Sequence, residues 1–155
     1  MKRVLFVCTG NICRSPTAEG LFRETLRSGG LEALISCDSA ATHDYHIGKP
    51  PDLRTRKAAK ARGVDLSSLR ARLVTRQDFH DFDLILAMGS DHYRHLSRMA
   101  PAGCAGKLRL FLDYSPDHAG EDVPDPYYGG PEGFEQVLDV VASALPGLLA
   151  ALRQE

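Results

Sequence analysis

The chain has 155 residues, of which 43% are hydrophobic and 25% are charged, and its formal net charge is −1. These values are typical of one soluble globular domain, long enough to bury a core without disulfides or metals. The near-zero charge argues against a nucleic-acid partner, because general nucleic-acid binders carry a basic excess that neutralises phosphates.

The chain begins with a charged start and an apolar, β-branched run at residues 4–8 (VLFVC), as expected of a strand buried on both faces of a parallel sheet. After a loop, Ser15-Pro16 has the residue types of a helix N-cap and first turn. Apolar residues then recur at helical spacing until Gly29-Gly30 ends this predicted helix. Residues 32–40 (EALISCDSA) predict a second strand.

The middle of the chain alternates between helical and extended patterns. Short apolar runs predict strands, and capping residues mark the helix starts. The predicted elements, in chain order, are a helix capped by Asp52 that runs to about Arg62, an extended piece at 71–75, a helical turn at 78–82, a strand at 82–88, a helix at 91–99 and a strand at 107–112.

The C-terminal part contains a long segment without periodicity, from Asp113 to Pro131. A loop of this length in a compact domain is usually functional. Residues 134–152 return to helical spacing, and Pro146-Gly147 inside them should kink or split the helix.

Strands that alternate with helices predict an α/β fold with an open parallel sheet and right-handed crossovers. We expect the whole chain, residues 1–155, to form a single domain. Ligands of such sheets bind at the carboxyl ends of strands. The segment CTGNICRS (8–15) lies at the carboxyl end of the first predicted strand.

The loop at residues 8–15 has the composition of an anion site with a nucleophile. It leads into a helix N-terminus, and Gly10 and Asn11 both tolerate positive φ, so its N–H groups can turn inward. Arg14 can grip two phosphoryl oxygens at once. These groups favour the thiolate of Cys8, which would lie under a bound phosphate, and the hydroxyl of Ser15 can donate to its sulfur.

Other residues of the chain leave alternatives open at this point. The acidic segment offers five carboxyls as a general acid, of which Asp125 is held between Pro124 and Pro126. Cys13 is either a core residue or a resolving thiol for an oxidised Cys8. The histidines are interpreted as surface or core residues, with His46 the only one of interest. The basic residues 54–76 and the acidic residues 113–125 form either solvated faces or a docking surface.

The segment VLFVCTGNICRSPTAEGLF resembles the signature of the low-molecular-weight protein tyrosine phosphatases. Three further segments resemble that family's segments in the family's order, so the resemblance covers nearly the whole chain. They are DSAATHDYHIGKPPDLR (38–54), DFDLILAM (81–88) and VPDPYYGGPEGFEQVLD (123–139). The resemblance implies a four-stranded parallel sheet of order 2-1-3-4 with helices on both faces.

The resemblance also implies a role for each matching residue. Cys8 matches the nucleophile, Arg14 the phosphate-binding arginine and Asp125 the general acid. Tyr45 and Tyr127 match aromatic residues at the pocket mouth. Phosphate would be held by the N–H groups of the loop, which is shaped by Asn11 and Ser15 and consists of Thr9, Gly10, Asn11, Ile12, Cys13 and Ser15.

Three positions depart from the pattern of the family. Gly89 stands where an Asp is frequent, and Leu69 and Leu73 stand where His and Gln are common. We expect supporting contacts to be lost or replaced there, whereas none of the chemical residues is missing.

The sequence therefore predicts a hydrolase that acts on phosphotyrosine without a metal or other cofactor. Arginine phosphatases share the scaffold but have a polar threonine at the position of Ile12, and arsenate reductases need further cysteines near residues 80–90. A non-catalytic phosphopeptide-binding module would need neither Cys8 nor Asp125. The expected partners are phosphotyrosine proteins, with room for a tyrosine kinase, and the expected state is a monomer or weak dimer.

The location is predicted from the N-terminus and the cysteines. The apolar run in MKRVLFVC is short and no cleavage site follows, so we expect no signal peptide. No stretch approaches the ~18 consecutive apolar residues of a membrane span. Four cysteines without a secretory signal indicate free thiols, and hence a redox-sensitive cytoplasmic protein with no membrane partner.

Overall fold

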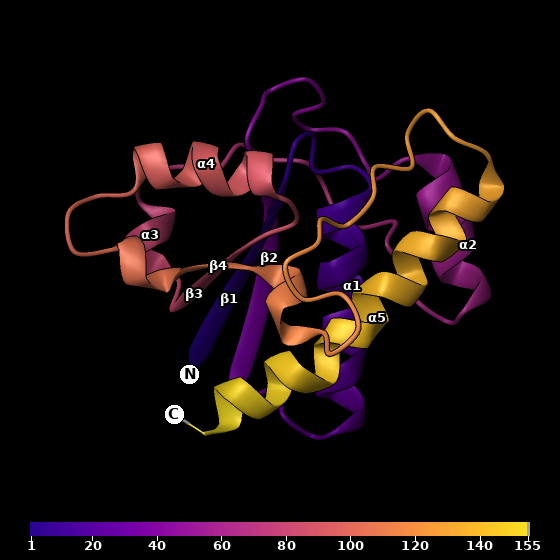
Figure 1. Cartoon of the computed structure of the whole chain (residues 1–155). Coiled ribbons are helices and arrows are strands. Elements are labelled where there is room, and N and C mark those ends of the chain that lie inside the picture. Colours follow the sequence, from indigo (N-terminus) through magenta and orange to yellow (C-terminus); the bar gives the residue numbers. More distant parts are fainter. Residues whose placement is uncertain (155) are drawn as a thin grey trace.

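Four parallel strands form the sheet at the centre of the computed structural model, which describes residues 1–154 (Figure 1). The order β2-β1-β3-β4 places β1 between two neighbours, and residues 4–8 of β1 are buried, as their continuous apolar run predicts. The α/β fold class and the strand order 2-1-3-4 are confirmed. The strands are β1 (Lys2–Cys8), β2 (Ile35–Ala41), β3 (Leu84–Ala87) and β4 (Leu108–Leu110).

Helices cover both faces of this sheet. Alternate side chains of β1 point to opposite faces, and both sets are apolar, so each face is buried under helices. Val4 and Phe6 pack with α1 (Arg14–Ser28) and α5 (Pro131–Arg153). Leu5 and Val7 pack with α3 (Asp78–Asp81) and α4 (Ser90–Met99) on the other face. The remaining elements are α2 (Leu53–Ala61) and the 3-10 turns η1 (Ala105–Lys107) and η2 (Phe111–Tyr114).

The start of α1 differs from the prediction that Ser15 caps it. The helix begins at Arg14 with Cys13 at the N-cap position, and Ser15 lies inside the first turn. The Ser15 hydroxyl lies 3.1 Å from Cys8 Sγ and so does not cap a backbone N–H group. The predicted cap of α2 is confirmed, because Asp52 accepts a hydrogen bond from the N–H of Arg54 at 2.8 Å.

α5 is one continuous helix, so Pro146 does not split it. Gly147 follows, and a Cβ atom there would lie 2.2 Å from the carbonyl oxygen of Tyr114 in η2. By length and composition this helix could also span a membrane, although polar residues such as Asp139 interrupt its apolar residues. The buried core helix of a globular protein meets the same criteria.

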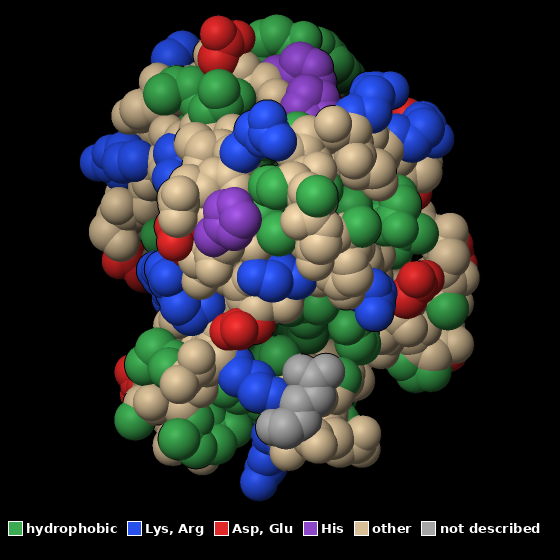
Figure 2. All heavy atoms as spheres, turned by 90° about the vertical axis from the view of Figure 1, so that its left-hand side faces the viewer, with side chains coloured by type: hydrophobic (Ala, Val, Ile, Leu, Met, Phe, Trp, Pro, Cys, Tyr) green, Lys and Arg blue, Asp and Glu red, His purple; other side chains and the backbone are tan. Residues whose placement is uncertain are grey.

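Charges of both signs are mixed on the surface. On the side of α3 and α4, basic and acidic side chains are interspersed (Figure 2). Three arginines of the basic segment 54–76 are paired: Arg54 with Asp52 at 3.0 Å, Arg62 with Glu135 at 2.6 Å, and Arg72 with Asp78 at 3.1 Å. These pairs favour solvated faces over a single basic docking surface.

Candidate active site

The loop between β1 and α1 borders a cavity of about 150 Å³ at the carboxyl end of β1. Nine of the predicted site residues line this cavity, together with His46 and Tyr128. Asn11 and Ser15 are buried behind the loop instead. The lining is Cys8, Thr9, Gly10, Ile12, Cys13, Arg14, Tyr45, His46, Asp125, Tyr127 and Tyr128.

A larger cavity, of about 500 Å³, lies between α1 and residues 63–69 and is bordered by Cys37. Burial raises the pKa of the Cys37 thiol to about 12, so it is protonated at neutral pH. The smaller cavity is therefore the candidate active site, since of the two only this one is lined by a thiol together with a loop that leads into a helix N-terminus.

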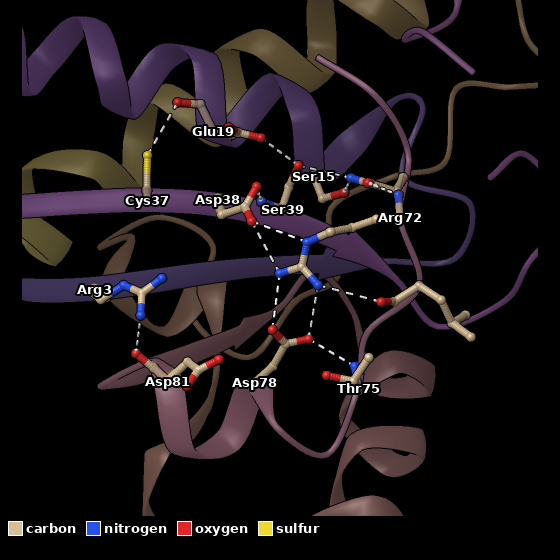
Figure 3. Close-up of polar contacts among 12 residues, drawn as sticks. Arg3, Ser15, Glu19, Cys37, Asp38, Ser39, Arg72, Thr75, Asp78 and Asp81 are labelled. Atoms are coloured by element: carbon tan, nitrogen blue, oxygen red, sulfur yellow. Dashed lines mark hydrogen bonds and ion pairs between the residues drawn. The ribbon is translucent and has the colours of Figure 1, made fainter. Parts of the chain in front are cut away.

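A chain of hydrogen bonds supports the Cys8 thiol from behind. The amide Nδ2 of Asn11 donates to Ser15 Oγ at 2.7 Å and to Ser39 Oγ at 2.9 Å. Because Ser15 Oγ accepts this bond, its own proton is available to Cys8 Sγ, 3.1 Å away. Ser39 in turn donates to Glu19 Oε1 at 2.6 Å, as Figure 3 shows.

Asn11 shapes the loop through its backbone as well as its side chain. Its φ is 58°, the only positive φ of a non-glycine residue in the described chain, and the Arg72 N–H donates to its Oδ1 at 3.1 Å. Gly10 does not adopt the positive φ that the sequence allowed. It is needed for close packing, since a Cβ there would lie 2.9 Å from the His46 ring.

Arg14 reaches back over the loop to Thr9. Its Nη2 lies 3.6 Å from Asp125 Oδ2 and donates to Thr9 Oγ1 at 3.4 Å, and its Nη1 donates to the Val123 carbonyl at 3.5 Å. The cation and the predicted acid thus lie side by side, although they are far apart in the sequence.

Asp125 is half exposed, with 52% of its side chain accessible, and is held by its own turn. Its Oδ1 accepts a hydrogen bond from the N–H of Tyr127 at 3.1 Å. The segment is anchored by the Val123 N–H, which donates to the Met88 carbonyl at 2.8 Å. A fixed but accessible carboxyl suits proton exchange with a bound ligand.

Aromatic side chains form the walls of the pocket. Tyr45 is 64% exposed and stacks on His43 with ring centroids 5.2 Å apart. Tyr127 lies across the pocket, and its ring centroid is 6.1 Å from that of His46 and 5.0 Å from that of Tyr128. The walls therefore suit a flat aromatic group.

His92 is a site residue that the sequence interpretation missed. It is 4% exposed, and its Nε2 lies 2.8 Å from Thr9 Oγ1. Burial, aided by the nearby charge of Arg14, lowers the pKa of His92 to about 4, so the ring is neutral at pH 7. Thr9 Oγ1 also accepts from Arg14 at 3.4 Å, so the hydrogen bond between His92 and Thr9 orients this hydroxyl beside the arginine.

Glu19, Ser39 and Arg72 were also missed. Glu19 is 1% exposed, and burial raises its carboxyl pKa, although Arg23 lies 2.5 Å away. Its position, four residues after Ser15 and three before Phe22, places it on the buried face of α1 and could have identified it. Arg72 bridges Asp38 and Asp78 in the same region (Figure 3).

The three departures have different outcomes. At Gly89, the carboxylate of Asp122 occupies the space beside the glycine. Asp122 accepts a hydrogen bond from the Ser90 N–H at 2.9 Å, and its carboxyl carbon would lie 3.1 Å from a Cβ atom on Gly89. Leu69 packs beside the buried cluster around Leu66. Leu73 is 42% exposed, and nothing in the structure explains it.

Cys13 lies in the pocket wall as a buried thiol. Burial raises its pKa to about 12, so it is protonated at neutral pH. Within residues 1–154, no group of three or more His, Cys, Asp or Glu side chains is placed to hold a metal ion.

Comparison with known proteins gives consistent matches over the full length. The family model described as "Low molecular weight phosphotyrosine protein phosphatase" matches residues 3–155. The low molecular weight protein-tyrosine-phosphatase of Streptomyces coelicolor is 46% identical over 156 residues, covering 99% of this chain and 94% of the relative. That of Bacillus subtilis is 41% identical, covering 100% and 98%. The crystal structure of a protein tyrosine phosphatase from Entamoeba histolytica matches with a TM-score of 0.95 and 38% identity, covering 99% of this chain and 98% of that one.

Proposed function

The chain belongs to the low molecular weight phosphotyrosine protein phosphatase family and is a protein tyrosine phosphatase; from that premise we propose that Cys8 is its nucleophile. One observation carries the assignment. Cys8 Sγ lies in a pocket that also presents Arg14 and Asp125, and it receives the Ser15 hydroxyl at 3.1 Å. The thiol thus lies at the start of the loop 8–15, which we call the phosphate loop, where a bound phosphate would meet its sulfur.

In the first step, the Cys8 thiolate attacks phosphorus, and the sulfur–phosphorus bond forms as the bond to the phenolic oxygen breaks. Asp125 donates its proton to that leaving oxygen. The loop N–H groups, the N-terminus of α1 and Arg14 stabilise the charge on the phosphoryl oxygens.

In the second step, water attacks the phosphocysteine. Asp125, now a carboxylate, takes a proton from the water, and the Cys8 thiolate leaves as inorganic phosphate forms. One carboxyl therefore serves as acid and then as base, which its accessibility allows.

The substrate class follows from the walls of the pocket. Tyr45, Ile12 and Tyr127 line a cavity of about 150 Å³ together with Cys8, which is 2% exposed whereas Tyr45 is 64% exposed. A phenyl ring fills such a slot and carries its phosphate to the sulfur, whereas the shorter phosphoserine side chain does not reach. The pocket therefore supports phosphotyrosine proteins as the substrates. A tyrosine kinase that phosphorylates these proteins is the second expected partner.

Two further properties belong to this proposal. Peroxide converts the Cys8 thiolate to a sulfenic acid, and Cys13 displaces water from it to form a disulfide, which thiols reduce again. The four free and buried cysteines support a cytoplasmic location. Peptide mapping after mild peroxide tests the first point, and cell fractionation tests the second.

The decisive experiment for the nucleophile compares the wild type with Cys8→Ser on an aryl phosphate, in excess chelator. Wild-type activity should persist in chelator, and rapid acid quenching should trap phosphate on Cys8. The variant should lose turnover but keep binding of a non-covalent phosphate analogue such as sulfate, because the N–H groups and Arg14 remain. Turnover by Cys8→Ser within tenfold of the wild type would exclude Cys8 as the nucleophile.

A further inference from the structure

A second cavity, of about 460 Å³, lies between α2 and the start of α5. These two helices lie side by side, below the loop that leads into α5 (Figure 1). We call this cavity the α2–α5 groove. Its lining includes Arg54, Lys57, Ala58, Ala61, Pro131 and Phe134. A volume of this size is within the range of ~300–1,000 Å³ found for ligand pockets.

Arg54 separates the α2–α5 groove from the active-site pocket. Its guanidinium carbon lies 4.7 Å from the ring centroid of Phe134 in the groove and 5.4 Å from that of Tyr127 in the pocket wall. Asp52 holds this guanidinium with two hydrogen bonds, of 3.1 and 3.0 Å. The N–H of Asp52 donates to the Ile12 carbonyl at 2.9 Å, so the partition is fixed to the phosphate loop.

The floor of the groove is apolar and continuous with the pocket. Phe134 is 3% exposed and belongs to the same buried cluster as Ile12 and Cys13 of the phosphate loop. Ala58 and Tyr127 pack against this cluster from its two sides. An apolar side chain in the groove would therefore extend a cluster that already forms the wall of the active site.

We propose that the α2–α5 groove is a substrate subsite that binds an apolar side chain of the phosphotyrosine peptide. The proposal rests on the function assigned above. Residues of an extended peptide advance by ~3.3–3.6 Å each, so a side chain within three residues of the phosphotyrosine crosses the wall formed by Tyr127 and Arg54. Arg54 uses two of its five N–H donors on Asp52, which leaves others for a peptide carbonyl.

The subsite predicts a particular kinetic signature. A side chain that is bound equally in the ground state and the transition state lowers KM and leaves kcat unchanged. Burial of one leucine side chain corresponds to an increase of roughly tenfold or more in kcat/KM. A small aryl phosphate does not reach the groove and should show no such effect.

The experiment measures kcat and KM for a set of phosphotyrosine peptides of Gly/Ser background. Each peptide carries one leucine, placed at one of the positions from three residues before to three residues after the phosphotyrosine. It compares the wild type with Ala61→Phe, which fills the groove from its exposed rim. Lys60→Phe adds the same ring to α2 outside the groove and is the matched control. Ala61→Met is a smaller filling variant, and turnover of an aryl phosphate shows that each variant is folded.

The expected result is a preference of about tenfold for leucine at one or two positions, expressed in KM, in the wild type and Lys60→Phe. Ala61→Phe should lose it, and all variants should hydrolyse the aryl phosphate equally. The proposal is overturned if no position prefers leucine or if the preference persists in Ala61→Phe. It is also overturned if the wild type dimerises and Ala61→Phe does not, since a second copy would then fill the groove. Loss of aryl phosphate hydrolysis in the wild type would instead refute the proposed function itself.

Discussion

The carboxyl of Asp125 is fixed by two neighbours, the N–H of Tyr127 and the guanidinium of Arg14. If this carboxyl is the general acid, its contribution to the rate of the first step depends on how strongly the leaving oxygen needs a proton. A tyrosyl phenolate, with a conjugate pKa of about 10, is a poor leaving group without one. A phenol of much lower pKa leaves unaided.

We therefore predict that Asp125→Asn slows phosphorylation of Cys8 on phosphotyrosine by roughly 10²- to 10⁴-fold, and that the defect shrinks as the phenol becomes more acidic. The measurement is the pre-steady-state burst with a series of aryl phosphates. Asp117→Asn is the control, because Asp117 is an exposed residue of the same acidic segment and does not line the pocket. A defect of equal size for every leaving group would remove Asp125 from the role.

His92 makes stability depend on pH, because its pKa is about 4 in the folded protein and about 6.5 when exposed. Between these values the unfolded state binds more protons, so the free energy of unfolding falls as the pH drops through 6.5 and levels off below about 4. The expected loss is about 3 kcal/mol from pH 7 to pH 4. In urea titrations at several pH values, His92→Gln should flatten this part of the profile, whereas the exposed His80→Gln should not. Parallel profiles for the two variants would contradict the prediction.

At the scale of elements, α5 and η2 meet at a point where only glycine fits. A Cβ on Gly147 would lie 2.2 Å from the Tyr114 carbonyl oxygen, so one of the two backbones must move. We predict that Gly147→Ala lowers the free energy of unfolding by about 1–3 kcal/mol, despite the higher helix propensity of alanine. Denaturant titration measures this. Gly106→Ala, where no atom lies within 4 Å of the added Cβ, should be nearly neutral, and equal stability of the two variants would show that α5 shifts freely.

Element types were predictable because each rests on local signals. The apolar run at 4–8 predicted a buried strand, and Asp52 predicted the start of α2. Ser15 was assigned wrongly for a physical reason. A serine before a proline has the chemistry of a cap, but here the hydroxyl contacts Cys8, which belongs to a different element. The loop motif predicted this contact, and it competes with capping for the same hydroxyl.

The site was predictable to the same extent. Cys8, Arg14 and Asp125 came from the motifs, and the structure brings them to one pocket. His92 and Glu19 were not found. The helical spacing of Glu19 indicates that it is buried, but it does not reveal which hydroxyl it contacts. The partners, Thr9 for His92 and Ser39 for Glu19, lie 83 and 20 residues away in the chain.

For the whole molecule, the two halves of the site depend on contacts of very different range. The loop that we propose to bind phosphate, here called the cradle, consists of consecutive residues, 8–15, between β1 and α1. The segment with Asp125 is held to the site by the hydrogen bonds of Val123 with Met88 and of Asp122 with Ser90, over 30 residues away. Arg14 contacts Val123 across 109 residues.

The anchoring of Val123 to Met88 therefore implies an order of events during refolding. Closing long loops is slower than forming local structure, so the cradle should be complete before the acid segment docks. In a stopped-flow refolding experiment, vanadate binding should return before turnover of a phosphotyrosine peptide. The first-step burst of phenol from an aryl phosphate with a very acidic phenol should return with the vanadate binding, since Asp125 is then needed only in the second step. A single common rate for all three signals would mean that nucleophile and acid assemble in one cooperative step.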